Sequence, residues 1–570
     1  MSASSTASTY LYLISTSGRN RFLTLLRRAR SPRYGAALVV GAVYIWAFLV
    51  RPANTTGAAS FLLGRTSEMI VTLLAVITLM GSWLFGSDIT ALAFSQAEVS
   101  FLFPAPVTRR SLVTYKLMRA QVAVLVNALI WVFVLRRGGT ALPSPLRAFS
   151  LWILFSTLNL HRLGAALVRA SVRAHGGVGA RRTRTSILAF GLVGAALVGG
   201  AFVHRAELRA ATDPTTFLSS LGHVLAQPPA YWGLYLFHLV VAPTFARSVA
   251  EWWRLIGPAV AVMLLHAWWV LHTDAAFEDA ALEASAERAK RADAMRSRRS
   301  IMATSVPRAP TSTLPLAAHG HPSLAILWKN TLCLRRTAQL RVFIGPVVMA
   351  GLLGSAFGSG LPTRTKVAMS ALVLTGMLII FGGRLIRNDL RQDMQHLPLL
   401  KTLPIASSHI VLAEVASAAI PMALVQAVLI AVAFVAFIGA RGAPFGAGTR
   451  LALLMASPAA LLAINGALVT SQNATAVLFP AWIRLGPAVT TGVETLGQNV
   501  LATAANLLSL GLSLVLPVAA GWGILALFSS ASESALVIAV IVGALILAAE
   551  TYAAMSYLGR ALARAEPAQT

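Results

Sequence analysis

The sequence is dominated by about a dozen apolar runs, each close to the 20 or so residues that a helix needs to cross a bilayer. Polar loops rich in arginine separate these runs. The composition agrees, because 57% of the 570 residues are hydrophobic and only 12% are charged. A water-soluble protein carries roughly twice that charged fraction. The sequence therefore predicts an all-α polytopic membrane protein.

The apolar runs form two sets, one in each half of the chain. The predicted spans are 34–50, 69–86, 117–135, 149–168, 185–203 and 255–271 in the first half, and 342–361, 366–383, 410–438, 451–471, 501–528 and 535–558 in the second. Two further segments are rich in aromatic residues or prolines, which favour the membrane interface. Segment 231–246 predicts a re-entrant or interfacial helix, or alternatively a thirteenth span, and 473–500 predicts an interfacial segment.

The basic residues predict how the chain is oriented across the membrane. The formal net charge is +28, arginine far outnumbers lysine, and most arginines cluster in alternate loops. This pattern is typical of loops that stay in the cytoplasm, and it accounts for the basic excess without a nucleic-acid partner. Both termini are then cytoplasmic, and six spans per half give two parallel six-helix transmembrane repeats. The single cysteine, Cys333, excludes an intrachain disulfide.

Three parts follow along the chain. Residues 1–272 form the first half, 273–322 form a cytoplasmic linker rich first in Ala, Glu and Arg and then in Pro, Ser and Thr, and 323–570 form the second half. Each half opens with a basic amphipathic stretch, 10–30 or 323–341, that predicts a helix lying in the membrane interface. Residues 1–9 are small and polar and are expected to be disordered. A signal peptide fits poorly, because the basic residues follow the apolar ones.

One short segment occurs twice, each time between the second and third spans of a half. The predicted coupling loops are 88–116 and 385–409, and the matching segments are AEVSFLFPAPVTRRSLVTYK at 97–116 and RNDLRQDMQHLPLLKTLPIASSHIVLAE at 387–414. Pro106 aligns with Pro404 at an offset of 298 (404 − 106). Each copy combines an apolar cluster with prolines that end a short helix. A short stiff helix joined to two spans can transmit force to both. The alternative is an interfacial helix that only anchors the loop.

The sequence contains no motif for catalysis, cofactor or metal binding. It has no GxxxxGK[ST] phosphate loop, no HExxH and no G-x-S-x-G elbow at a helix start. The spans are nearly free of Asp, Glu, Lys and Arg, which usually mark ion pathways. Glu550 is the main exception, whereas Asn127 and Asn465 are typical of helix–helix hydrogen bonds. One hypothesis is an ion-coupled secondary transporter, which would use Glu550. Another is a membrane-embedded enzyme or scaffold.

The repeated segments resemble those of ABC-2-type transporter permeases, specifically the bacterial "putative ABC exporter" group with two fused half-permeases. The resemblance implies a bacterial inner-membrane exporter whose coupling helices dock on separate ATP-binding cassette subunits, which use the ATP. Two departures occur in the second copy, where serines replace the basic pair and Glu414 stands in the place of Lys116. The docking residues implied are Glu98, Phe101, Leu102, Phe103, Pro104, Pro106, Arg109, Arg110 and Lys116 in the first copy, and Asp389, Arg391, Asp393, Leu397, Leu400, Lys401 and Pro404 in the second.

Overall fold

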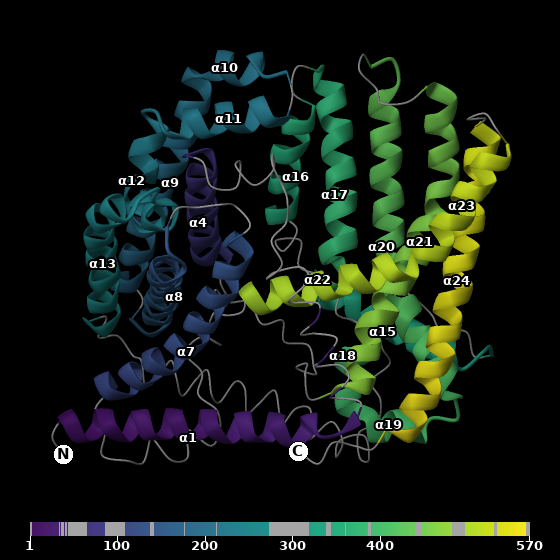
Figure 1. Ribbon diagram of the computed structural model, residues 1–570, viewed down its shortest axis with the longest axis horizontal. Coiled ribbons are helices and arrows are strands. Elements are labelled where there is room, and N and C mark those ends of the chain that lie inside the picture. The colour runs from purple at the N-terminus through teal and green to yellow at the C-terminus, as the bar shows by residue number, and fades with distance from the viewer. Residues whose placement is uncertain are drawn as a thin grey trace. The chain divides into compact units, whose positions relative to one another are not determined.

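The computed structural model describes residues 3–32, 65–85, 109–136, 142–175, 177–212, 214–272, 319–337, 344–358, 361–385, 389–440, 446–480, 496–528 and 533–565, together with positions 35, 39 and 43. Every regular element within these ranges is helical (Figure 1). This confirms the prediction of an all-α polytopic membrane protein.

The described helices follow one another along the chain. They are α1 (Ala3–Ala29), α4 (Arg65–Phe85), α7 (Arg109–Arg136), α8 (Ser144–His175), α9 (Gly177–Val203), α10 (Arg205–Ala210), α11 (Pro214–Leu225), α12 (Ala230–Val241), η2 (Ala242–Phe245), α13 (Val249–His272), α15 (Ser323–Thr337), α16 (Ile344–Phe357), α17 (Thr363–Leu385), α18 (Leu390–Asp393), η4 (Met394–His396), α19 (Leu397–Thr402), α20 (Ser407–Phe437), α21 (Ala447–Leu478), α22 (Leu496–Ser513), α23 (Val515–Leu527) and α24 (Glu533–Arg564).

Among the described residues, eight helices are long and apolar enough to cross a membrane. They lie in α4, α7, α8, α13, α17, α20, α21 and α24, and the pair Leu501–Ser513 and Val515–Leu527, bent by 43°, gives a ninth if it is one span. Two predicted spans correspond to shorter apolar helices, Leu188–Val203 and Gly345–Phe357. The first predicted span, 34–50, and the linker up to residue 318 lie outside the fully described residues.

Three features differ from those predicted, and one alternative is decided. Helix α1 begins at Ala3, so the expectation that residues 1–9 are disordered was wrong. Helix α21 continues to Leu478, so the start of the predicted interfacial segment 473–500 belongs to a span. The fifth span of the second half is broken at Leu514. The apolar helix Ala230–Phe245 is shorter than a span, which favours the re-entrant or interfacial interpretation of 231–246.

The chain divides into two compact units. Unit 1 comprises Met1–Leu208, Leu218–Pro310 and Thr491–Gln498, and unit 2 comprises Arg209–Phe217, Thr311–Thr490 and Asn499–Thr570. Helices α4 and α17 begin 298 residues apart (363 − 65), and so do α7 and α20 (407 − 109). This is the offset that aligns the two copies of the repeated segment. The second and third spans of each half therefore start in register, while the parallel arrangement of the two halves stays a prediction.

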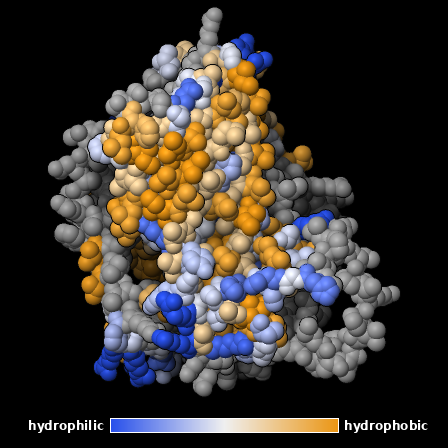
Figure 2. Space-filling view, turned by 90° about the vertical axis from the view of Figure 1, so that its right-hand side faces the viewer, coloured by the Kyte–Doolittle hydropathy of each residue, from blue (hydrophilic) through white to orange (hydrophobic). Residues whose placement is uncertain are grey.

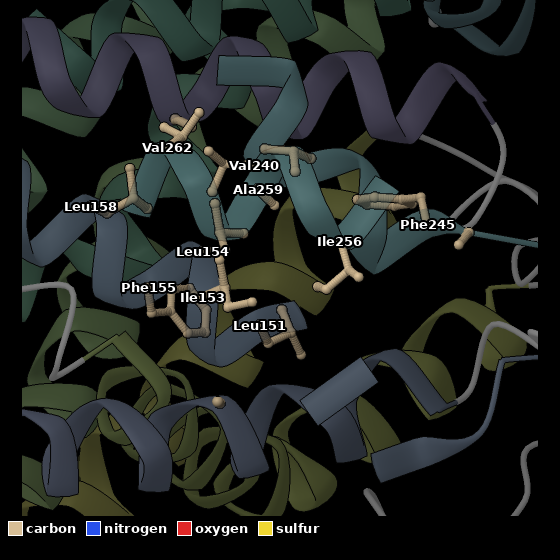
Figure 3. Close-up of a cluster of buried hydrophobic side chains, with 14 of the residues drawn as sticks. Leu151, Ile153, Leu154, Phe155, Leu158, Val240, Phe245, Ile256, Ala259 and Val262 are labelled. Carbon is tan, nitrogen blue, oxygen red and sulfur yellow. The ribbon is translucent and has the colours of Figure 1, made fainter. Parts of the chain in front are cut away.

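The core of unit 1 is built around α8. Leu151, Leu154 and Leu158 recur at helical spacing on α8 and pack in one buried cluster with residues of α13 such as Ile256 and Ala259 (Figure 3). Two hydrogen bonds add to this packing. Ser156 Oγ donates to Gln121 Oε1 of α7 at 2.8 Å, and Trp252 Nε1 of α13 donates to Ser150 Oγ at 2.8 Å.

A chain of polar side chains crosses three helices of unit 1. Trp83 Nε1 of α4 donates to His161 Nε2 of α8 at 2.9 Å, and His161 Nδ1 lies 3.2 Å from His266 Nε2 of α13. His266 Nδ1 lies 2.8 Å from the carbonyl oxygen of Val262. Because Trp83 can only donate, His161 donates through Nδ1 and His266 donates to the carbonyl. Both imidazoles are therefore neutral in this arrangement.

The core of unit 2 joins α20, α21 and α24. Asn465 Nδ2 of α21 donates to Gln426 Oε1 of α20 at 2.5 Å, and this confirms the prediction that Asn465 forms a helix–helix hydrogen bond. The surface of unit 2 separates by polarity. Figure 2 shows a broad apolar band on the side where α20, α21, α23 and α24 lie, with hydrophilic residues gathered below it. An apolar band of this kind is expected on the lipid-facing side of a membrane protein.

Candidate functional site

The second copy of the repeated segment, residues 389–405, is the best described of the predicted functional regions. It consists of α18, η4 and α19, between the end of α17 and the start of α20. Asp389 caps α18, because its extended backbone lets the carboxylate accept from the Arg391 N–H at 3.0 Å. Helix α19 has a proline in its first turn and ends at Leu403, whose extended backbone suits the residue before Pro404.

The apolar residues of the segment face inward. Leu390, Met394, Leu397 and Leu400 recur every three or four residues, and all are buried in one cluster. That cluster also contains Ile326 of α15 and residues of α20, α21 and α24, including Val411, Val469 and Leu558. Figure 1 shows α15, α18 and α19 together at the lower ends of the unit 2 helices. The segment is thus packed against the ends of several helices of unit 2.

The charged residues of the segment also bond within unit 2. Arg391 forms a bidentate pair with Asp389, with Nε–Oδ1 at 2.9 Å and Nη2–Oδ2 at 2.6 Å, and its Nη2 also donates to the Gly383 carbonyl of α17 at 2.7 Å. Asp389 and Arg391 are almost fully buried. Lys401 donates to the carbonyl of Ala563 at 3.2 Å and to that of Ala565, at the end of α24. A cation here also suits the negative end of the helix dipole.

A third ion pair joins the segment to α15. Lys329 of α15 pairs with Asp393 of α18, and its Nζ lies 3.9 Å from Glu414 Oε1 of α20. Glu414 is completely buried, and its Oε2 accepts from Asn330 Nδ2 at 2.8 Å. Asn330 Nδ2 also lies 3.0 Å from Ser417 Oγ. The segment is therefore bonded to α15, α17 and α24 by three different charged side chains.

The outward face of the segment carries little charge. Its exposed residues are Gln395, Pro398, Leu399, Lys401, Thr402 and Pro404. Leu399 is the only large hydrophobic residue exposed among residues 389–405, with 58% of its surface accessible. Lys401, the one charged residue on this face, is bonded to α24. A partner meeting this face would therefore contact mainly apolar and uncharged polar groups.

The predicted docking residues of the second copy divide into two groups. Asp389, Arg391, Leu397 and Leu400 are buried, and Asp393 is largely covered. Only Lys401 and Pro404 are exposed. Buried residues cannot contact a partner in this conformation, so these five position the segment. Leu399 and Pro398, which the sequence reasoning left out, form the exposed surface. No local signal separated Leu399 from the buried Leu397 and Leu400, which are residues of the same type.

Most of the first copy lies outside the described residues. This applies to Glu98, Phe101, Leu102, Phe103, Pro104 and Pro106. Arg109 and Arg110 form the start of α7, and Lys116 lies on α7 and is partly exposed. The beginning of α7 packs on α1, since Tyr10 and Tyr115 have ring centroids 5.2 Å apart and lie in one buried cluster with Leu112. In each unit, the helix predicted to be interfacial thus contacts the start of the third predicted span.

The sequence reasoning missed the charged cluster around Lys329. Its signal was a single acid, Glu414, in the apolar run 410–438, together with Lys329 and Asn330 in a preceding amphipathic helix. It also missed the histidines of unit 1, because histidine was not counted among the charged residues of the spans. Glu550, named for ion coupling, is partly exposed on α24.

A family model described as "Putative ABC exporter" matches residues 9–558, which is nearly the whole chain and includes both copies of the repeated segment. No curated protein matches the chain.

Proposed function

The chain belongs to the putative ABC exporter family, and from this premise we propose that it is the membrane-spanning permease subunit of an ATP-driven exporter. Membership makes it a component of an ABC transporter, and its apolar helices make it a multi-pass membrane protein. The proposal adds that both half-permeases are fused in this one chain, in a bacterial inner membrane with both termini in the cytoplasm.

Energy in this proposal comes from a separate subunit. The sequence contains no phosphate-binding GxxxxGK[ST] loop. Of the acids in the spans that the structure describes, only Glu414 and Glu550 lie beyond the first helical turn, so a proton or sodium gradient has few carboxylates to act on. Two ATP-binding cassette subunits would bind and hydrolyse the ATP, one docking at residues 94–110 and the other at 388–406. Their closure would move the helix ends joined to each segment and open a path for the substrate.

The observation that carries this proposal is the way the second segment is built. Its buried leucines and three charged side chains hold it against α15, α17 and α24, while Leu399 and Pro398 remain exposed. A partner that docked here would cover Pro398 and Leu399, and the centre of a protein interface is more apolar than its rim. Force applied there would reach several helices together, because the segment is packed and bonded to each of them.

The test is co-purification with the ATP-binding cassette subunit encoded in the neighbouring reading frame. We expect the wild-type chain to retain that subunit and the double variant Phe101→Asp with Leu399→Asp to lose it. Leu324→Asp is the control, because Leu324 is an exposed leucine on α15, outside the segment. Retention of the subunit by the double variant would refute docking at these segments. Transport that persists after ATP depletion and stops with an uncoupler would instead support an ion-coupled transporter.

A further inference from the structure

The ion-pair cluster at Lys329 has a geometry that packing alone does not explain. Three residues on one face of α15 each contact a different part of unit 2. Ile326 enters the buried cluster of the segment, Lys329 pairs with Asp393 of α18, and Asn330 donates to Glu414 of α20. Residues separated by three and four positions share a helix face. This face of α15 therefore touches the docking segment and the third span together.

Two acidic side chains, those of Asp393 and Glu414, converge on the single ammonium group of Lys329. The Glu414 side chain is completely buried and that of Asp393 is 14% exposed. Two acids brought together at a buried site repel each other unless a cation lies between them or one of them keeps its proton. Lys329 is the cation that lies between the segment and α20 at this point.

We propose that Lys329 is a positioning residue that clamps the docking segment to the third span and makes α15 part of the body that moves when the partner closes. The inference rests on the proposed function, since it concerns the same docking segment. In this arrangement α15 is more than a membrane anchor. Asn330 holds Glu414 from the same helix, so α15, the segment and the start of α20 are joined at two adjacent residues. A displacement of the segment would then carry α15 with it.

The chain provides a convenient reporter for this clamp. Its one cysteine, Cys333, lies on α15, and the exposed Thr402 lies at the end of α19. Spin labels on Cys333 and on Thr402→Cys report the distance between α15 and the segment in the full chain, in lipid nanodiscs. We expect one narrow distribution, whose mean changes by less than about 2 Å, the size of an ordinary helix shift, when ATP is trapped in the docked subunit.

Three variants separate clamping from folding. Lys329→Met removes the charge with little loss of length and is expected to broaden the distribution even without the partner, because the ion pair with Asp393 is lost. Lys329→Arg is expected to restore the narrow distribution. Lys329→Met with Asp393→Asn removes the excess negative charge, so its melting temperature should recover while the broad distribution remains. Arg335→Met is the control, because Arg335 is an exposed base on the same helix.

Function is measured beside the distances. Lys329→Met is expected to retain the ATP-binding cassette subunit, because Lys329 lies outside the exposed face around Leu399, but to lose most of the ATPase stimulation produced by the docked chain. A merely structural role would lower retention and stimulation together. A narrow distribution in Lys329→Met, or restored clamping in the double variant, would overturn the proposal. Failure of the subunit to bind the wild-type chain would refute the proposed function, and the distances measured without a partner would still test the clamp.

Discussion

Leu399 and Leu397 lie two positions apart on α19, and they should respond to truncation in opposite ways. Leu399 is 58% exposed and Leu397 is 2% exposed. Complete burial of a leucine side chain contributes about 1.5–3 kcal/mol. A partner that covers the exposed part of Leu399 would gain about 0.9–1.7 kcal/mol, so Leu399→Ala should weaken binding roughly 4- to 18-fold. The melting temperature of the Leu399→Ala variant should stay at the wild-type value.

Leu397→Ala should instead destabilise the chain. The side chain lies in the buried cluster with α20, α21 and α24, and the loss of such a leucine costs about 2–5 kcal/mol. The melting temperature of Leu397→Ala should fall clearly. The folded fraction of this variant should bind the partner more nearly like the wild type than Leu399→Ala does. Leu424→Ala is the matched control, because Leu424 is a 62% exposed leucine of the same unit on α20. It should change neither quantity.

The assay is titration of the purified ATP-binding cassette subunit onto the chain in nanodiscs, with thermal unfolding followed on the same samples. The first copy of the segment is intact in these variants, so binding should weaken without vanishing. Wild-type affinity in Leu399→Ala, with the expected loss of stability in Leu397→Ala, would show that the segment is well folded but is not the docking surface. Equal loss of stability in both variants would contradict the assigned burial.

Three further outcomes test individual contacts. Lys401→Met should speed amide exchange in the last turn of α24, because two carbonyl oxygens there lose their donor, and unchanged exchange would refute this. Gly559→Ala should lower the melting temperature because the added carbon would lie 2.6 Å from the backbone of α20, whereas Gly523→Ala, with open space around it, should not. His161→Phe should destabilise the chain by about 1–3 kcal/mol, because Trp83 Nε1 loses its acceptor, and an unchanged melting temperature would contradict that role.

The sequence predicted the helical spans well because their signal is strong and local. A lipid-crossing helix must be apolar along about 20 residues, whatever it packs against. The prolines of the repeated segment were equally informative, since Pro404 ends α19 through its effect on Leu403. The alignment of Pro106 with Pro404 also predicted the register at which α7 and α20 begin.

The residues that face inward or outward within the segment were harder to predict. Leu397, Leu399 and Leu400 are adjacent apolar residues of one type, and only the packing of α20, α21 and α24 determines which of them is covered. The same limit applies to Asp389 and Arg391. Two charged residues suggest a surface, yet here each satisfies the other in the interior. Burial depends on contacts between segments that are distant in the chain, and local patterns do not contain this information.

The two interfacial helices hold their spans by different chemistry, although they contact matching places. In unit 2, α15 holds the start of α20 through Lys329, Asn330 and the buried Glu414. In unit 1, Lys116 stands at the position that corresponds to Glu414, and α1 meets α7 through Tyr10, Tyr115 and an apolar cluster. Ionic contacts weaken as salt screens partly exposed charges, whereas apolar contacts do not. High salt should therefore loosen α15 from its span by weakening the Lys329 cluster, and α1 serves as the comparison. Amide exchange measured for both helices at low and high salt tests this directly. Equal responses would show that the Lys329 cluster contributes no more to the attachment of α15 than packing does.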